Sequence, residues 1–427
     1  MSDKPRGASR RDVLKGMAAA AATGVAGSAL SGLPTRVRAQ TARTLRIGMP
    51  TILSGRVAIL GQSSGNAVQM AVDKINGAGG IAGRKLELVI RDSKGKPDEA
   101  ARVTRDLVNT EGCEIIIDAE ASSGAFAVQE VVRDLGVLCI HTCSETSALT
   151  ADPKLHVATA FRCARQGIHD AVSGGQYAAD IARAKGLKRW MTCSPDYAYG
   201  RDNTAEFLLY AKRFEPSIEV IDQAWPKLFQ PDYTEVITKI LQVQPQSMYS
   251  ALWGGDLVTF IEQSNLYSLF SNIAFFSGGL GDPPVLTAIK SLPQGLNTVY
   301  RYNELYPADP GNKAFGEEYK KRFNQEPTNW SWQNSVAMDF VAEALRATSG
   351  GTDGKALAGK IAGMTVKSPF GMDGTITMRG TDHTIINYPA AWGVTVPKFP
   401  YVVDFKPADW KQIVELEQEW KKEKGYA

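Results

Sequence analysis

A short apolar run, a loop of small residues and an amphipathic helix follow one another repeatedly after residue 43. Segment 44–50 (TLRIGMP) reads as a strand, and segment 65–76 (GNAVQMAVDKIN) places Val68, Val72 and Ile75 at helical spacing. Parallel neighbouring strands need a crossover of a dozen or more residues, usually a helix. The rhythm therefore predicts an α/β fold with parallel sheets and right-handed crossovers.

The rhythm forms two series, and we expect each series to build one lobe. The first series ends with the strand-like segment 137–142 (VLCIHT), and the second runs from 188–194 (KRWMTCS) to 273–279 (IAFFSGG). No low-complexity linker separates them, so short segments must connect the lobes. A chain that is 44% apolar and 22% charged has the composition of a globular protein. It contains no basic stripe, so we do not expect a nucleic acid as a partner.

Residues 1–39 have the composition of an export leader. Their seven Lys or Arg outnumber their two Asp by five, and this excess is larger than the formal net charge of +3 of the whole chain. Arg10 and Arg11 precede a weakly apolar stretch that is too short to span a bilayer, which takes ~20 helical residues. The pattern resembles a twin-arginine signal, and small residues lead to a cleavage point before Gln40. We predict export through the twin-arginine machinery and a mature protein in the periplasm.

The glycine-rich segment 76–83 (NGAGGIAG) invites comparison with phosphate-binding loops. Those loops run from a strand into a helix. Here the glycines follow a helix and precede the strand-like RKLELVIRD, which is the reverse order. The segment is therefore predicted to be a turn after a helix C-cap, where glycine tolerates left-handed backbone. No nucleotide cofactor is implied.

The pattern N-x-x-G-G-I-x-G-x-x-L-E-x-x-x-x-D, from Asn76 to Asp92, resembles the signature of a known family. The family is the type I periplasmic binding proteins of the leucine/isoleucine/valine class, and matching stretches cover about residues 45–400. The resemblance implies two Rossmann-like lobes joined by three crossovers, with a hinge cleft that closes over a small solute. The solute is handed to an ABC permease in the membrane.

The same resemblance implies the division of the chain into lobes. The boundaries it implies are a first lobe of 44–162 plus about 302–378, a second lobe of 163–301 plus about 379–400, and a C-terminal extension of 401–427.

Polar residues after the third and fourth strands are candidates for the site. Ser122 and Ser123 begin a helix after the strand CEIIID, where free N–H groups favour an anion. Serine is also a common N-cap, so capping explains both residues without a ligand. The resemblance assigns this position to a ligand carboxylate, and it assigns Cys143, Ser144 and Glu145 to a second set of polar contacts. Glu145 departs from the family, which usually has Ser or Thr there.

Residues of the second lobe are expected to supply flat walls and the far end of the cleft. Tyr197 and Tyr199 follow one strand and Trp253 follows another, on loops that face the cleft in the family. Gly279 stands where amino-acid binders carry the acid that holds the ligand ammonium. Whether Asp282, three residues on, reaches the cleft is left open.

Three further patterns do not require a functional site. Trp330 and Trp332 fit helix packing as well as a binding site. G-x-S-x-G at 61–65 would make Ser63 a hydrolase nucleophile, but no His and Asp in a recognisable context accompany it. Cys139, His141 and Cys143 alternate on one strand without an evident fourth metal ligand, so a core strand is favoured.

The sequence thus predicts a non-enzymatic, cofactor-free binding protein of an ABC importer. A periplasmic sensor subunit for a receptor kinase would use the same fold, and the neighbouring genes would distinguish the two. Because Gly279 cannot neutralise an ammonium, aromatic or aliphatic carboxylates and amides are preferred over zwitterionic amino acids. Glu145 or Asp282 could reverse that preference. Some of the five cysteines could pair in an oxidising compartment.

Overall fold

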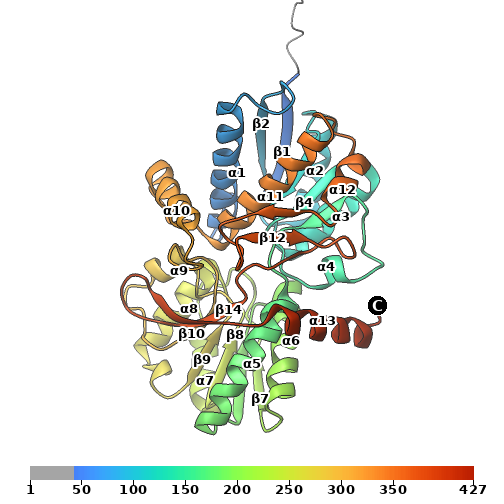
Figure 1. The fold of residues 1–427 in the computed structure, drawn as a ribbon. Coiled ribbons are helices and arrows are strands. Elements are labelled where there is room, and N and C mark those ends of the chain that lie inside the picture. Colours follow the sequence, from blue (N-terminus) through green and yellow to red (C-terminus); the bar gives the residue numbers. More distant parts are fainter. Residues whose placement is uncertain (1–42) are drawn as a thin grey trace, which may run out of the picture. The chain divides into compact units, whose positions relative to one another are not determined.

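Strand and helix alternate through the first series in the computed structural model, which describes residues 43–427 (Figure 1). The elements are β1 (Leu45–Thr51), α1 (Ile59–Gly77), β2 (Leu86–Asp92), α2 (Pro97–Asn109), β3 (Ile115–Asp118), α3 (Ser122–Leu135), β4 (Leu138–His141), α4 (Ala148–Ala151) and β5 (Ala160–Arg162). The strands form a parallel sheet in the order β2-β1-β3-β4-β5. The chain reverses its direction across the sheet between β1 and β3, which is where ligands bind in such folds.

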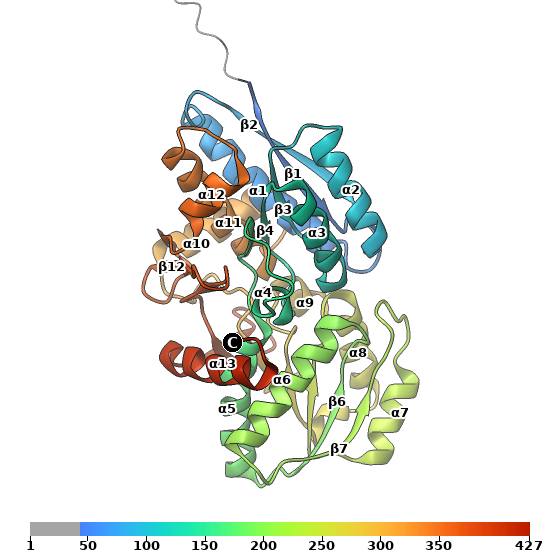
Figure 2. The ribbon, with the colours of Figure 1, turned by 90° about the vertical axis from the view of Figure 1, so that its right-hand side faces the viewer.

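Helices cover both faces of this sheet, so its central strands are mostly buried and carry long apolar side chains. Ile47 of β1 pairs in register with Ile115 of β3, and both side chains are fully buried. In Figure 2, α1 and α11 lie on one side of the strands and α2 and α3 on the other. The amphipathic periodicity of the sequence reflects this arrangement.

The glycine-rich segment forms the predicted turn. Helix α1 ends at Gly77, and Gly79, Gly80 and Gly83 have positive φ angles before β2 begins. A Cβ on Gly80 would lie 2.1 Å from the carbonyl oxygen of Arg84, so no larger residue fits there.

The second series forms a seven-stranded sheet. Its elements are α5 (Gly167–Lys185), β6 (Arg189–Cys193), α6 (Ala198–Phe214), β7 (Glu219–Ala224), α7 (Thr234–Val243), β8 (Ser247–Ser250), α8 (Gly254–Leu266), the 3₁₀ helix η1 (Leu269–Ser271), β9 (Ala274–Ser277), α9 (Pro283–Ala288) and β10 (Asn297–Val299). The strand order is β15-β14-β10-β9-β8-β6-β7, in which β14 and β15 are antiparallel additions.

The remaining elements are divided between the two sheets. They are α10 (Pro310–Phe323), α11 (Asn329–Ala347), α12 (Gly354–Ile361), β11 (Thr365–Lys367), β12 (Thr375–Met378), β13 (Ile385–Ile386), β14 (Ala391–Thr395), β15 (Val402–Pro407) and α13 (Trp410–Lys424). Helix α11 packs on α1, and β11, β12 and β13 form a three-stranded antiparallel sheet. We call the five-stranded sheet with α1–α4, α10–α12 and this small sheet the first lobe. The seven-stranded sheet with α5–α9 is the second lobe.

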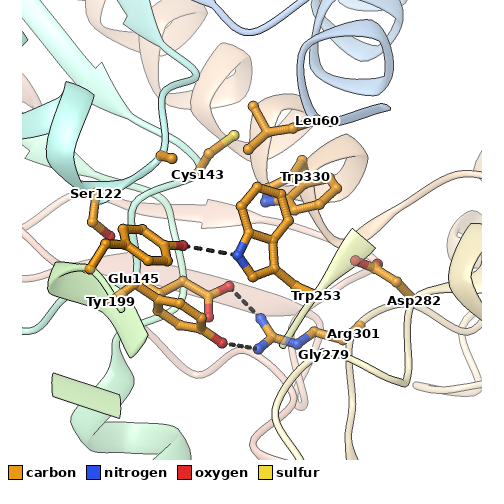
Figure 3. A pocket seen from close by; sticks show the side chains of 12 residues that line it. Leu60, Ser122, Cys143, Glu145, Tyr199, Trp253, Gly279, Asp282, Arg301 and Trp330 are labelled. Carbon is orange, nitrogen blue, oxygen red and sulfur yellow. Dashed lines mark hydrogen bonds and ion pairs between the residues drawn. The ribbon is translucent and has the colours of Figure 1, made fainter. Parts of the chain in front are cut away.

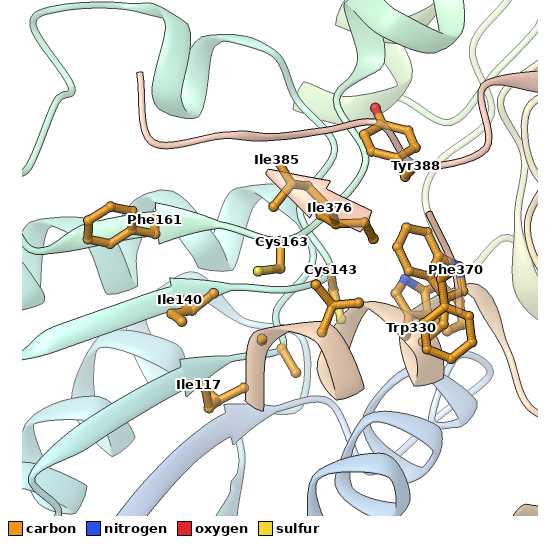
Figure 4. Packing of buried hydrophobic residues seen from close by; sticks show 14 of the residues in the cluster. Ile117, Ile140, Cys143, Phe161, Cys163, Trp330, Phe370, Ile376, Ile385 and Tyr388 are labelled. Carbon is orange, nitrogen blue, oxygen red and sulfur yellow. The ribbon is translucent and has the colours of Figure 1, made fainter. Parts of the chain in front are cut away.

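The three-stranded sheet belongs to the first lobe because it is joined to β5 by a parallel bridge between Arg162 and Thr384. Figure 4 shows Ile385 of the small sheet next to Cys163, and both belong to the same buried apolar cluster as Ile140 and Phe161 of the larger sheet. The backbone N–H of Arg162 also donates to the carbonyl of His383 at 2.7 Å.

The chain passes between the lobes three times: between β5 and α5, after β10, and between β13 and β14. The third passage therefore follows Ile386, beyond the predicted boundary near residue 378. Strand β15 lies within the predicted extension 401–427, yet it is the edge strand of the second sheet. Such short antiparallel strands carry little periodic signal, which is why the sequence does not reveal them.

The predicted leader, residues 1–39, lies outside the described residues. Within residues 43–427, no helix has the combined length and apolar character that crossing a bilayer requires. All five cysteines fall in this range, and each is buried and unpaired.

Candidate functional site

Side chains from both lobes surround one partly open cavity with about 380 Å³ of empty space (Figure 3). Its wall is formed by Leu60, Ala121, Ser122, Cys143, Glu145, Tyr197, Tyr199, Trp253, Gly279, Asp282, Arg301 and Trp330. Six of the eight predicted site residues are among them. The other two, Ser123 and Ser144, do not line the cavity.

Ser122 stands at the start of α3, directly after β3. The N-cap is Ala121, and no side chain caps the helix, so capping does not account for the serine. The first N–H groups of a helix have no partner within it, and they favour an anion. Ser144 is buried behind Ser122 and donates to its Oγ at 3.2 Å. Ser144 thus positions Ser122, whereas the side chain of Ser123 is partly exposed elsewhere.

Four aromatic side chains contribute to the wall. Tyr197 and Trp253 are the N-caps of α6 and α8, because each follows a strand of the second lobe. The indole Nε1 of Trp253 donates to the Tyr197 hydroxyl at 2.9 Å. Trp330 enters from the first lobe, and its ring meets that of Trp253 edge to face, with centroids 5.8 Å apart. Tyr199 completes this apolar surface.

Gly279 is required by a close backbone approach. A Cβ at this position would lie 2.4 Å from the carbonyl oxygen of Leu252 and 3.1 Å from the Cα of Trp253. The loop that carries Trp253 therefore occupies the space that an acidic side chain would need. An acid at residue 279 is incompatible with this arrangement of the cavity.

Glu145 is held by a cation of the protein. Its Oε1 pairs with Nη1 of Arg301 and accepts from Nδ2 of Asn329 at 3.1 Å. The same guanidinium donates to the carbonyl of Gly278 and to the Tyr199 hydroxyl, the latter at 3.3 Å. Both charged side chains are buried, so the pair compensates charges that would otherwise be costly. The acid that departs from the family is thus matched by Arg301.

Asp282 reaches the cavity. It is the N-cap residue of α9, and its Oδ1 accepts from the backbone N–H of Asn329 at 2.7 Å. Burial raises the pKa of Asp282 to about 6, although Arg301 and the Asn329 N–H act in the opposite direction. Figure 3 places Asp282 and Ser122 on opposite sides of the Trp253 indole. The cavity therefore has a hydrogen-bond donor end at Ser122 and an acceptor at its other end.

Sequence reasoning missed Arg301 and left the two tryptophans of α11 undecided. Arg301 lies two residues beyond the end of β10, and a charged residue at the carboxyl end of a strand is the signal that could have indicated it. The structure separates the tryptophans: Trp330 lines the cavity, while Trp332 is fully buried. Nε1 of Trp332 donates to the Arg301 carbonyl at 2.9 Å, so Trp332 supports the site from behind.

The two lobes also touch beside the cavity. Arg56, in the loop after β1, donates from Nε to Oδ1 of Asp256 in α8 at 3.1 Å. Its Nη2 donates to Thr259 Oγ1 at 2.5 Å. Asp256 is buried, whereas the Arg56 side chain is 35% exposed. Arg56 thus makes a direct polar contact between the two lobes.

The residues that suggested a hydrolase or a metal site, Ser63 and the pair Cys139 and His141, are buried away from the cavity wall. The Ser63 hydroxyl is buried in α1, where it donates to the Leu60 carbonyl and accepts from Thr328 Oγ1 at 2.9 Å. His141 contacts Asp118 at 2.5 Å and lies 3.9 Å from Cys139, and all three are fully buried. Within residues 43–427, no three or more His, Cys, Asp or Glu residues are placed to hold a metal ion.

Comparison with known proteins gives a consistent result. The profile of a family described as "Periplasmic binding protein" matches residues 44–395. A Leu/Ile/Val-binding protein homolog of Brucella abortus is 25% identical over 364 residues, covering 80% of this chain and 82% of the relative. The leucine-, isoleucine-, valine-, threonine-, and alanine-binding protein of Pseudomonas aeruginosa is 23% identical, covering 81% and 90%.

Solved structures share the fold. The solute-binding protein of an ABC transporter from Rhodopseudomonas palustris, in complex with 3,4-dihydroxybenzoic acid, has a TM-score of 0.76 at 22% identity, covering 86% of this chain and 98% of that one. A branched-chain amino acid transporter substrate binding protein from Streptococcus pneumoniae, in complex with isoleucine, has a TM-score of 0.70 at 19% identity, covering 86% and 99%.

Proposed function

Because this chain belongs to the periplasmic binding protein family, we propose that it captures a small organic solute between its lobes for an ABC permease. One observation carries the proposal: the wall of a single cavity is divided between the two lobes, with Ser122 and Trp330 on one side and Tyr199 and Trp253 on the other. A ligand in that position contacts both lobes at once. It therefore stabilises a closed arrangement over an open one, and the permease would recognise the closed form.

We propose that the ligand is a carboxylate with a flat apolar body and a hydrogen-bond donor at the end far from the carboxylate. The N–H groups and hydroxyl at Ser122 suit the carboxylate, and the rings of Trp253 and Trp330 suit an aromatic body. Asp282, across the indole, can accept from a phenol. The wall already holds the carboxyls of Glu145 and Asp282 and the guanidinium of Arg301. An anionic ligand therefore needs a hydrogen-bond donor at the end that meets Asp282.

Hydroxybenzoates meet these requirements. An α-amino acid carries its ammonium beside its carboxylate, so it could reach only one of the two ends. Gly279 also favours hydroxybenzoates over amino acids, because no acid that could hold an ammonium fits at this position. The relatives with benzoate-type and branched-chain ligands make both classes proper comparisons.

The test is calorimetry on residues 40–427 with 4-hydroxybenzoate, benzoate, leucine and 4-methylpentanoate, the last being leucine without its amino group. Ser122→Ala should weaken binding of the aromatic acid by ~1.5–3 kcal/mol, roughly ten- to hundredfold, because a bond to a charged group is lost. Ser123→Ala is the matched control and should change little. Leucine binding far more tightly than 4-methylpentanoate and the benzoates would overturn the proposed ligand class and make Asp282 or Glu145 its ammonium partner.

The route to the membrane is part of the same proposal. Residues 1–39 would direct export through the twin-arginine machinery and be removed before Gln40. The protein would then work in the periplasm, where the permease is accessible.

A further inference from the structure

Helix α13 lies outside the part of the chain that the family profile matches, which ends at residue 395. One face of this helix packs on the second lobe. Ile413, Leu416 and Trp420 are buried in a cluster with Ile168 and Val172 of α5. The Tyr210 hydroxyl of α6 also donates to the Leu416 carbonyl at 2.9 Å. The apolar contact anchors α13 to the second lobe.

Helix α13 also contacts the first lobe, through charged side chains. Glu417 is fully buried, and it receives two bonds from Arg379, which follows β12 of the three-stranded sheet. The bonds join Nη1 to Oε2 at 2.5 Å and Nη2 to Oε1 at 2.8 Å. Lys421 donates to Asp382 Oδ2 at 2.7 Å, in the loop between β12 and β13. These pairs tie α13 to the first lobe through charged groups.

The helix also lies beside two of the three passages between the lobes. The indole of Trp410 donates to the Tyr388 carbonyl at 2.9 Å, in the passage before β14. The Tyr388 hydroxyl accepts from the backbone N–H of Gln166 at 3.0 Å, in the passage after β5. His169 lies 3.1 Å from Glu417, off the hydrogen-bond direction. In Figures 1 and 2, α13 runs between the elements of the two lobes.

We propose that α13 is a brace across the hinge, which holds the ligand-free lobes close to the arrangement described here. Any rotation that opens the cleft must move Arg379 and Asp382 relative to a helix fixed on α5 and α6. Separating Glu417 from Arg379 would break two charge-assisted bonds of a buried carboxylate and leave it Lys421 of its own helix and His169 of α5 as charged neighbours, which is costly. The brace thus raises the population of the binding-competent form, and apparent affinity rises with that population. This inference rests on the proposed capture by lobe closure.

The experiment compares two glutamates of the same helix in the ligand-free protein, residues 40–427. Glu417→Gln weakens the link between the lobes. Glu419→Gln is the matched control, because Glu419 is exposed and pairs with Arg213 of α6, in the second lobe. Small-angle scattering should give a larger radius of gyration for E417Q and an unchanged one for E419Q. No ligand is needed, so the result is independent of which solute is bound.

A second variant covers the case in which E417Q does not fold. Asp382→Asn keeps the side-chain shape while weakening the bonds from Lys421 and Arg379, whose contact with Asp382 is 2.5 Å. It should also increase the radius of gyration. Folded E417Q or D382N with the wild-type radius would overturn the brace. Failure of every panel ligand to bind, with the radius still increased, would instead count against the proposed ligand and leave the brace standing.

Discussion

Replacing Asp282 by Asn should stabilise the ligand-free protein at pH 8. Asp282 is buried at the acceptor end of the cavity. Burial is the main reason why its pKa is raised from 3.8 to about 6. An asparagine retains the oxygen that accepts from Asn329 N–H, and it removes the buried charge. The wild-type carboxylate is thus kept at a cost in stability, as is common at binding sites.

The magnitude follows from the two pKa values. A carboxyl whose folded-state pKa is raised binds its proton more tightly when folded, so the stability it contributes is lost as pH rises through that range. A rise from 3.8 to about 6 corresponds to about 3 kcal/mol at pH 8, where the loss is complete. At pH 5 the buried carboxyl lowers the free energy of unfolding by about half of that amount, and at pH 4 by about 0.6 kcal/mol.

The assay is scanning calorimetry of D282N and wild type between pH 4 and pH 8. For a chain of this size, about 3 kcal/mol should raise the unfolding midpoint by roughly 3–6 °C at pH 8, and by much less at pH 4. Asp353→Asn is the control, since Asp353 is an exposed N-cap that an Asn can replace. A D282N midpoint equal to or below wild type at pH 8, or a gain independent of pH, would refute the reasoning. The same variant should bind 4-hydroxybenzoate roughly tenfold more weakly, because a charged acceptor is lost.

Three other outcomes are expected. Glu120→Gln should raise the unfolding midpoint at pH 8, because burial and the nearby Asp118 carboxylate raise the pKa of Glu120 well above its usual range; calorimetry that finds a lower midpoint would contradict this. Arg56→Ala should weaken binding of 4-hydroxybenzoate by roughly three- to tenfold, since it removes a contact between the lobes at a partly buried pair. Arg46→Ala, which breaks an exposed pair within the first lobe, is its control, and equal affinities for the two variants would show that the Arg56 contact does not aid closure. Changing Arg10 and Arg11 to Lys should block export, and N-terminal sequencing of exported wild type should begin near Gln40; exported protein that still carries residue 10 would rule out the leader.

Position along the chain, together with the family resemblance, located much of the cavity. Ser122, Tyr199 and Trp253 each follow a strand of a predicted parallel sheet, and the carboxyl ends of such strands meet at one edge. The alternation of strand and helix is a local pattern with a fixed period, so it can be read without knowing the fold. The turn at 76–83 is local in the same sense, because its glycines adopt the positive φ angles that this short reversal of the chain requires.

Contacts between distant segments decided the remainder. Gly279 is a glycine because the backbone at Leu252 occupies its side-chain space. Glu145 is neutralised by Arg301, which is 156 residues away in the chain. Trp330 and Trp332 differ by two positions on one helix, so only the packing of α11 determines which ring faces the cavity.

The sequence by itself therefore determined the fold class, the order of the elements and the loops that carry the site. The tertiary structure decided the charge balance of the cavity, the third passage between the lobes and the position of α13 across them. The physical reason is that secondary structure follows from the periodicity of neighbouring residues, whereas the partner of a buried charge such as Glu417 is set by how complete elements pack.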